Sequence, residues 1–178
     1  DINEPIRDSY VSRVRWLIAN LLTALLGATI ISHFGGAIEK LVALAALSPM
    51  VASIGGNAGT QTMAAAVRAL ATNQLTRANT GRILLRELRV ALLNGVTVAT
   101  LIGLATAFFF ANPLLGAVIG TAVVVNIITA GLAGVIVPVL FDRFDQDPAV
   151  ASSVFVTMIT DSMGFFAFLG LAVASGLV

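Results

Sequence analysis

Cysteine is absent from this chain, and charged side chains make up only 11% of its 178 residues. The lack of cysteine excludes disulfides and thiolate metal sites, and the one histidine, His33, is expected to lie at an interface rather than to bind a metal. Because soluble domains carry about 25% charged residues, the composition indicates a polytopic membrane protein. The net charge of +1 is uninformative about nucleic acid, but the basic residues are scattered on the flanks of apolar segments with no aromatic residues between them, which argues against a nucleic-acid partner.

What the chain has instead is apolar length, with 58% hydrophobic residues. Each of five apolar segments is long enough to cross a hydrocarbon core of about 30 Å at about 1.5 Å per helical residue. The sequence therefore predicts an all-α membrane helix bundle with five transmembrane helices per protomer. The segments run over residues 16–32, 41–70, 83–111, 113–141 and 148–178.

The second segment is unusual in its middle. Pro49 and the pair Gly55-Gly56 are expected to interrupt it, close to the polar residues Asn57, Thr60 and Gln61. Glycines four residues apart allow helices to approach closely in lipid. We therefore expect Gly55 and Gly59 to bring this segment against the fifth, and Gly116 and Gly120 to pack the start of the fourth.

Basic residues in the short connections predict the orientation in the membrane. The connection between the first and second segments carries only Lys40, and that between the third and fourth carries no charge. The amino terminus and the second-to-third and fourth-to-fifth connections are thus expected in the cytoplasm, and the carboxyl terminus outside. The arginines behind this prediction are Arg7, Arg13, Arg15, Arg68, Arg77, Arg82, Arg86 and Arg89.

Asp161 is the one charged residue within the last apolar segment. A carboxylate in the middle of a membrane span costs at least about 2.5–3.5 kcal/mol on insertion scales, so it usually has a partner or a function. Thr157 lies one helical turn before it and Gly164 one turn after it, on a similar face. A purely structural alternative is that Asp161 pairs with Asn126 or Gln61 and only fixes neighbouring helices.

One carboxylate per chain cannot form a cation cage, but two copies related by a two-fold axis would bring two together. Mg²⁺ is commonly held by one or two carboxylates and several waters, and the oxygen donors of this chain favour hard cations. Mg²⁺, Mn²⁺ and Ca²⁺ all remain open on these grounds. A second acidic group, Asp142, Asp145 and Asp147, is either a solvated turn in which Asp147 caps the next helix or a cation site.

Three runs of sequence resemble one known family. The run SPMVASIGGNAGTQTMAAAVRALAT (residues 48–72), with its GGNxGTQ core, resembles the second span of the MgtE magnesium channels and transporters. The run DPAVASSVFVTMITDSMGFFAFLGLA (residues 147–172) is similar to the last span of that family, and RILLRELRVALLNG between them also fits. The resemblance covers nearly all of the chain from Val14 onward.

The resemblance implies a homodimer of five-span subunits, with a cation pore on the two-fold axis lined by the second and fifth spans. The magnesium-binding aspartate of the family falls on Asp161, with Thr157 nearby and Asp147 at a cytoplasmic acidic position. The implied pore-lining residues are Asn57, Gly56, Thr60 and Ser153. Ser153 stands where some members have Asn, so a lining contact there is not implied with the same strength.

Family members also carry soluble magnesium-sensing domains joined by a helix to the first span. Residues 1–13 resemble the end of that connecting helix, and residues 14–178 the pore domain. We therefore expect this chain to lack the cytoplasmic regulatory domains.

The expected function is transport of Mg²⁺ or a similar divalent cation across the cell (inner) membrane, with the lipid bilayer as surroundings. The alternatives are a cation-coupled Mg²⁺ exchanger and a non-transporting membrane scaffold. An enzyme is not expected, because the sequence offers no paired nucleophile and base.

Overall fold

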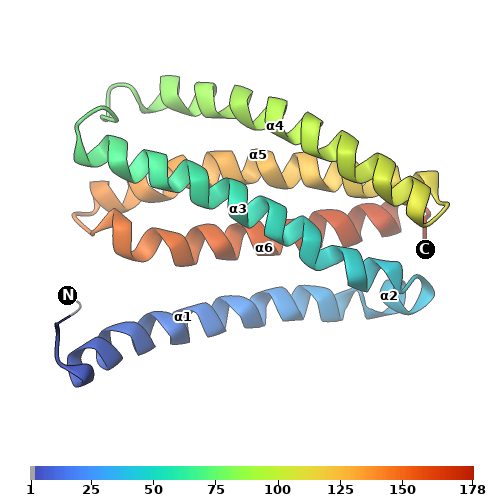
Figure 1. The fold of residues 1–178 in the computed structure, drawn as a ribbon, viewed down its shortest axis with the longest axis horizontal. Helices are drawn as coiled ribbons and strands as arrows, with labels where there is room; N and C mark the ends of the chain where they lie inside the picture. The colour runs from blue at the N-terminus through green and yellow to red at the C-terminus, as the bar shows by residue number, and fades with distance from the viewer. Residues whose placement is uncertain (1–2) are drawn as a thin grey trace.

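The computed structural model describes residues 3–178, apart from the side chain of Val150, and all the regular structure in that range is helical. The long helices α3 to α6 lie side by side in a bundle, with α1 alongside α6 at its edge (Figure 1). The helices are α1 (Ile6–His33), α2 (Gly35–Lys40), α3 (Ala43–Ala71), α4 (Thr80–Phe109), α5 (Pro113–Arg143) and α6 (Pro148–Ala174).

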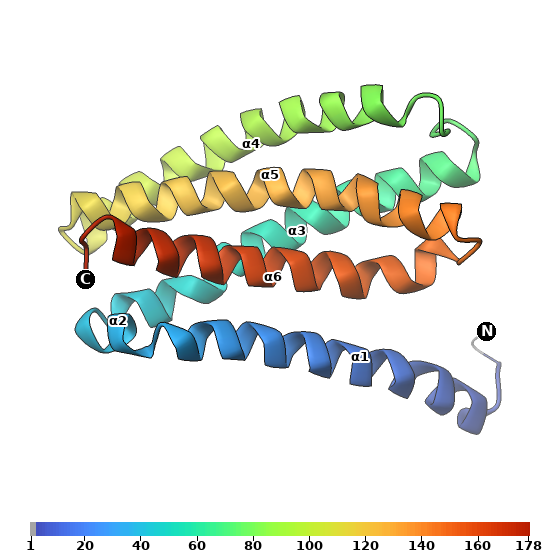
Figure 2. The same ribbon diagram turned by 180° about the vertical axis from the view of Figure 1, so that it is seen from behind.

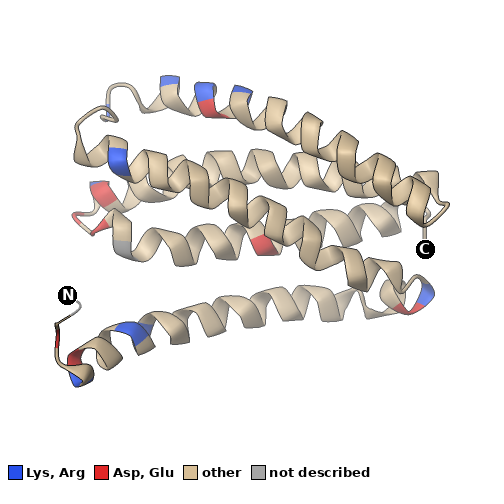
Figure 3. Cartoon of the chain, in the orientation of Figure 1, with Lys and Arg blue, Asp and Glu red and all other residues tan. Residues whose placement is uncertain are grey.

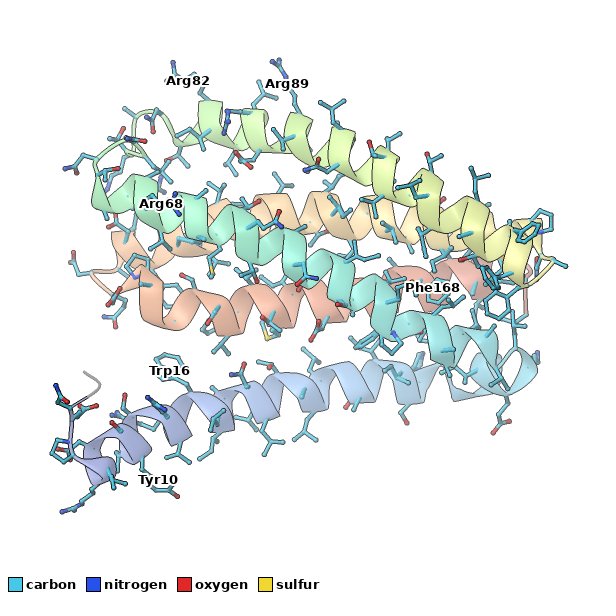
Figure 4. The ribbon with its side chains drawn as sticks, in the orientation of Figure 1. Tyr10, Trp16, Arg68, Arg82, Arg89 and Phe168 are labelled. Atoms are coloured by element: carbon cyan, nitrogen blue, oxygen red, sulfur yellow. The ribbon has the colours of Figure 1, made fainter. Side chains whose placement is uncertain are left out.

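Helix α5 forms the centre of the bundle. It lies between α4 and α6 (Figure 2) and also packs against α3. Leu115, Ile119, Val123 and Ala130 of α5 are fully buried, as is Phe168 of α6, which points into the bundle (Figure 4). The most hydrophobic segment thus forms the core, whereas Gly27 is the only described residue of α1 that is fully enclosed.

Within the described residues, four helices have the length and hydropathy of a membrane span: α1, α4, α5 and the stretch Ala151–Ala174 of α6. Helix α3 has 29 residues and runs along the same bundle, but its polar residues keep it out of that group. The all-helical membrane architecture is therefore confirmed, and a fifth membrane crossing by α3 stays a prediction.

The expected interruption of the second segment is wrong, because α3 is continuous from Ala43 to Ala71 with Pro49 inside it. Proline removes one backbone donor, and lipid offers no other partners to the backbone groups that a broken helix would release. Beside the proline, the Ser48 hydroxyl donates to the Leu44 carbonyl over 2.6 Å.

Where a capping residue directly precedes a proline, the helix begins at the residue that the sequence predicts. The Asn112 side chain accepts a hydrogen bond from the Leu115 amide ahead of Pro113, and α5 begins there as predicted. At the amino-terminal side, α1 begins at Ile6 and runs without a break through residue 13, where we divide linker from pore domain. That division stays a prediction.

The connections between the helices are segregated between the two ends of the bundle. Figure 1 places the amino terminus, the 72–79 connection and the α5–α6 connection at one end, and α2, the α4–α5 connection and the carboxyl terminus at the other. Arg82, near the start of α4, and Arg89, about two turns further along, project away from the bundle (Figure 4). The amino terminus and the two connections that the basic residues assign to one side of the membrane thus lie at one end of the bundle, and the side that this end faces stays a prediction.

Candidate functional site

Helix α3 carries a line of exposed polar side chains, which we call the α3 polar stripe: Ser53, Asn57 and Thr60. Their spacing of four and three residues places them along one side of the helix. The Thr60 hydroxyl donates to the Gly56 carbonyl over 2.8 Å, which leaves its oxygen lone pairs outward. A stripe of this kind is poorly suited to lipid and well suited to water or hydrated ions.

Helix α6 carries the second set of polar residues. Ser153 is exposed, and Thr157 and Asp161 are half-buried, at four-residue intervals along one face. Asp161 is the only acidic residue of α6. Figure 3 shows acidic colour at mid-length of α6, whereas the charges of the other helices gather toward the ends of the bundle.

The Asp161 carboxylate has no hydrogen-bond donor or ion-pair partner among residues 3–178. Asn126, one of the two expected partners, instead donates from Nδ2 to the Val51 carbonyl over 3.0 Å. Gln61, the other, is exposed on α3. Within one protomer the aspartate is therefore not an element of a helix–helix lock.

The two polar faces belong to helices whose backbones nearly touch. A Cβ atom added to Gly59 would lie 2.8 Å from Val156 Cγ1, and one added to Gly164 would lie 3.0 Å from the Ala52 Cα. Gly56, which we expected to line a pore, faces Thr160 of α6 across this contact. The prediction that the glycine run brings α3 against α6 is thus confirmed, with one difference: Gly55 faces Asn126 of α5.

Helix geometry places Asn57 and Asp161 on the same side of this pair. Gly55 faces α5, and Ile159 packs with Ala133 and Val137 of α5. Asn57 and Asp161 each come two residues later, which is about 200° around a helix with about 3.6 residues per turn. Ideal helix geometry therefore places both residues on the side of the α3–α6 pair that faces away from α5, which we call the outer side of the pair.

Asp147 lies apart from these residues. Its carboxylate is exposed and accepts a hydrogen bond from the Ala149 amide over 2.9 Å, so it caps α6 ahead of Pro148. Fourteen helical residues at about 1.5 Å each separate it from Asp161 by about 21 Å. In the described part of the chain, no three His, Cys, Asp or Glu residues are close enough together to hold a metal ion.

The structure shows two polar features that the sequence does not predict: an interhelical contact of Asn126 and a cleft beside Glu87. Asn126 has no exposed surface, and its contact with Val51 joins residues 75 positions apart, which no local pattern reveals. A cleft of about 250 Å³ between α3, α4 and α5 is lined in part by Gln61, Asn94 and Glu87, whose carboxylate pairs with Arg86 over 2.8 Å. Glu87 lies within the basic flank RILLRELR, whose arginines predict orientation and do not mark a site.

Fold and site together define a helical membrane protein with an unpaired intramembrane carboxylate beside a polar helix face. The family described as divalent cation transporter, MgtE, matches residues 48–171. Magnesium transporter MgtE of Bacillus subtilis is 32% identical over 91% of this chain, that of Thermus thermophilus 34% over 92%, and that of Enterococcus faecalis 36% over 84%.

The chain belongs to the MgtE family, as the sequence resemblance predicted. It spans about a third of the length of these relatives, with alignments that cover 36%, 36% and 33% of them.

Proposed function

We propose that this chain forms the membrane pathway of a Mg²⁺ transporter and that Asp161 binds the ion in transit. The observation that carries the proposal is the Asp161 carboxylate, half-buried in an apolar helix and without a partner among the described residues. An unpaired carboxylate at membrane depth is costly unless water or a cation approaches it. The exposed α3 polar stripe on the same side provides a surface along which a hydrated ion can pass.

The second element of the proposal is a homodimer with its two-fold axis beside the outer side of the α3–α6 pair. In this arrangement two Asp161 carboxylates face one ion, and Asn57, Thr60, Thr157 and Ser153 line the path. Mg²⁺ gives up its water reluctantly and is commonly held by one or two carboxylates and several waters. A site with two carboxylates and surrounding hydroxyl and amide oxygens meets that requirement.

We further propose that the arginine-rich end of the bundle faces the cytoplasm. Arg68, Arg77 and Arg82 lie near the 72–79 connection, whereas the opposite end carries Glu39 and Lys40. Asp147, at the cytoplasmic end of α6, would then lie at the inner entrance, where its charge attracts cations while its side chain caps the helix.

Uptake of Mg²⁺ into liposomes containing the purified protein tests the proposal. Asp161→Asn removes the charge at nearly constant shape and should lower uptake at least about tenfold, the scale found when groups that support a metal site are removed. Asp8→Asn, which removes an exposed carboxylate in the first turn of α1, away from the proposed path, is the matched control and should leave uptake nearly unchanged. Equal uptake by the Asp161→Asn and unchanged proteins would contradict the proposal.

The same liposomes separate the alternatives. A passive channel carries Mg²⁺ down its electrochemical gradient with no counter-ion gradient, whereas a coupled exchanger requires H⁺ or Na⁺ on the opposite side. A membrane scaffold would show no uptake in either condition while still folding and dimerising.

A further inference from the structure

Asn126 is the only described polar residue of α5 that has no exposed surface, and it stands where α3, α5 and α6 meet. Its Nδ2 donates to the Val51 carbonyl of α3 over 3.0 Å. A Cβ added to Gly164 of α6 would lie 2.8 Å from the same nitrogen, and one added to Gly55 of α3 would collide with the Asn126 amide. The side chain therefore occupies space that glycines on two other helices leave open.

The residues that Asn126 contacts lie close along the chain to the residues of the proposed pathway. Gly55 is two residues before Asn57, and Gly164 is three residues after Asp161. A helix that turns by one residue moves its side chains by about 100°. If α3 or α6 rotated about its axis, Asn57 and Asp161 would leave their common side of the pair.

We propose that Asn126 is a positioning residue that fixes the rotation of α3 against α6 and thereby aligns Asp161 with the α3 polar stripe. The proposal rests on the proposed cation pathway, although Asn126 does not touch the ion. Its amide is the one polar link among these three helices in the described residues, since Thr60, Thr129 and Thr160 bond only to carbonyls of their own helices.

The chemistry of Asn126 indicates that its side chain selects one arrangement of the helices rather than stabilises the bundle. Its Oδ1 is buried and has no hydrogen-bond partner in the structure, and a buried acceptor without a partner costs free energy. A single buried asparagine in a coiled coil selects the register at a cost in stability. By the same reasoning, Asn126→Leu should keep or raise the thermal stability of the bundle and still impair transport.

The test combines transport, stability and a distance. Because the chain has no cysteine, spin labels at Ala46→Cys on α3 and Val173→Cys on α6, both exposed, report the α3–α6 geometry. Labelled protein is diluted with excess unlabelled protein, so that a dimer of the proposed kind carries at most one labelled chain. Thr129→Val on α5 is the matched control, because its hydroxyl bonds only to Val125 of the same helix.

Asn126→Leu should lower Mg²⁺ uptake about tenfold, as removal of groups that support a metal ligand does, and should broaden or shift the label distance while the melting temperature is kept. Thr129→Val should change neither uptake nor distance. Asn126→Asp, which keeps the shape and in its neutral form one O–H donor for Val51, should restore the distance and most of the uptake.

An Asn126→Leu protein with unchanged distance and unchanged uptake would overturn the proposal, and so would an Asn126→Asp protein that keeps the distance but loses uptake. If Asn126→Leu does not fold, the Asn126→Asp protein decides by the same two readings. The label distance needs no transport, so a protein that carries no Mg²⁺ at all would refute the proposed function and still leave the positioning role measurable.

Discussion

Gly164 provides the most direct structural test of the α3–α6 contact. In the substitution Gly164→Ala, the new Cβ would lie 2.8 Å from Asn126 Nδ2, 3.0 Å from the Ala52 Cα and 3.2 Å from the Ala52 amide nitrogen. Non-bonded carbon atoms are most stable about 3.5–4.0 Å apart, so α3 and α6 would have to separate by about 0.5–1 Å. Two of the three atoms belong to backbone and cannot move away alone.

The size of the effect follows from two opposing terms. Inserting a methyl group into a packed core typically costs about 1–3 kcal/mol, whereas replacing glycine by alanine inside a helix gains about 1 kcal/mol from helix propensity. Gly170→Ala, on the same helix, is the matched control, because its Cβ would meet no atom within 4 Å. The propensity term cancels between the two variants, so Gly164→Ala should be about 1–3 kcal/mol less stable than Gly170→Ala.

Reversible unfolding in mixed detergent micelles measures this difference, and Mg²⁺ uptake should fall for Gly164→Ala alone because the same contact orients Asp161. Equal unfolding midpoints for the two alanine variants would refute the close contact between α3 and α6.

Three further outcomes can be checked in the same assays. Asp147→Ala should cost about 1 kcal/mol of stability through loss of the cap on the Ala149 amide, whereas Asp147→Asn should keep the cap. Lowered uptake in both variants would assign a cation role to the charge. Unchanged uptake in Asp147→Asn would limit the residue to capping. Asn57→Leu should change the free energy of unfolding by no more than about 0.5 kcal/mol, as for other exposed sites, and should reduce uptake. Normal uptake would exclude Asn57 from the pathway. Asn112→Ala should destabilise the protein by about 1 kcal/mol through loss of the Leu115 bond, with Asn112→Asp as the control that keeps an acceptor; equal stability of the two would show that the cap contributes little.

Features that depend on neighbouring residues could be predicted from the sequence. The start of α5 at Pro113 and of α6 at Pro148 follows from a capping residue directly before proline. The family, the helical membrane class and the isolation of Asp161 also follow from composition and local sequence. These features need no knowledge of which helices touch.

Features that depend on contacts between distant segments could not be predicted. Pro49 and Gly55 look like helix breakers in isolation, yet α3 continues through both, with Pro49 exposed and Gly55 packed against Asn126 of α5. The bond from Asn126 to Val51 likewise exists only once three helices have assembled. Local periodicity contains no information on such pairs, so the sequence predicts for Asn126 only a possible pairing with Asp161.

The most direct test of the central claim is anomalous scattering from Mn²⁺ in crystals of the protein. Mn²⁺ is a hard cation that prefers the same oxygen ligands as Mg²⁺. The account predicts an anomalous peak between two Asp161 carboxylates on a two-fold axis, lost in Asp161→Asn and displaced by excess Mg²⁺. A dimer in which Asp161 faces lipid or lies far from the axis, with no Mn²⁺ beside it, would contradict the account.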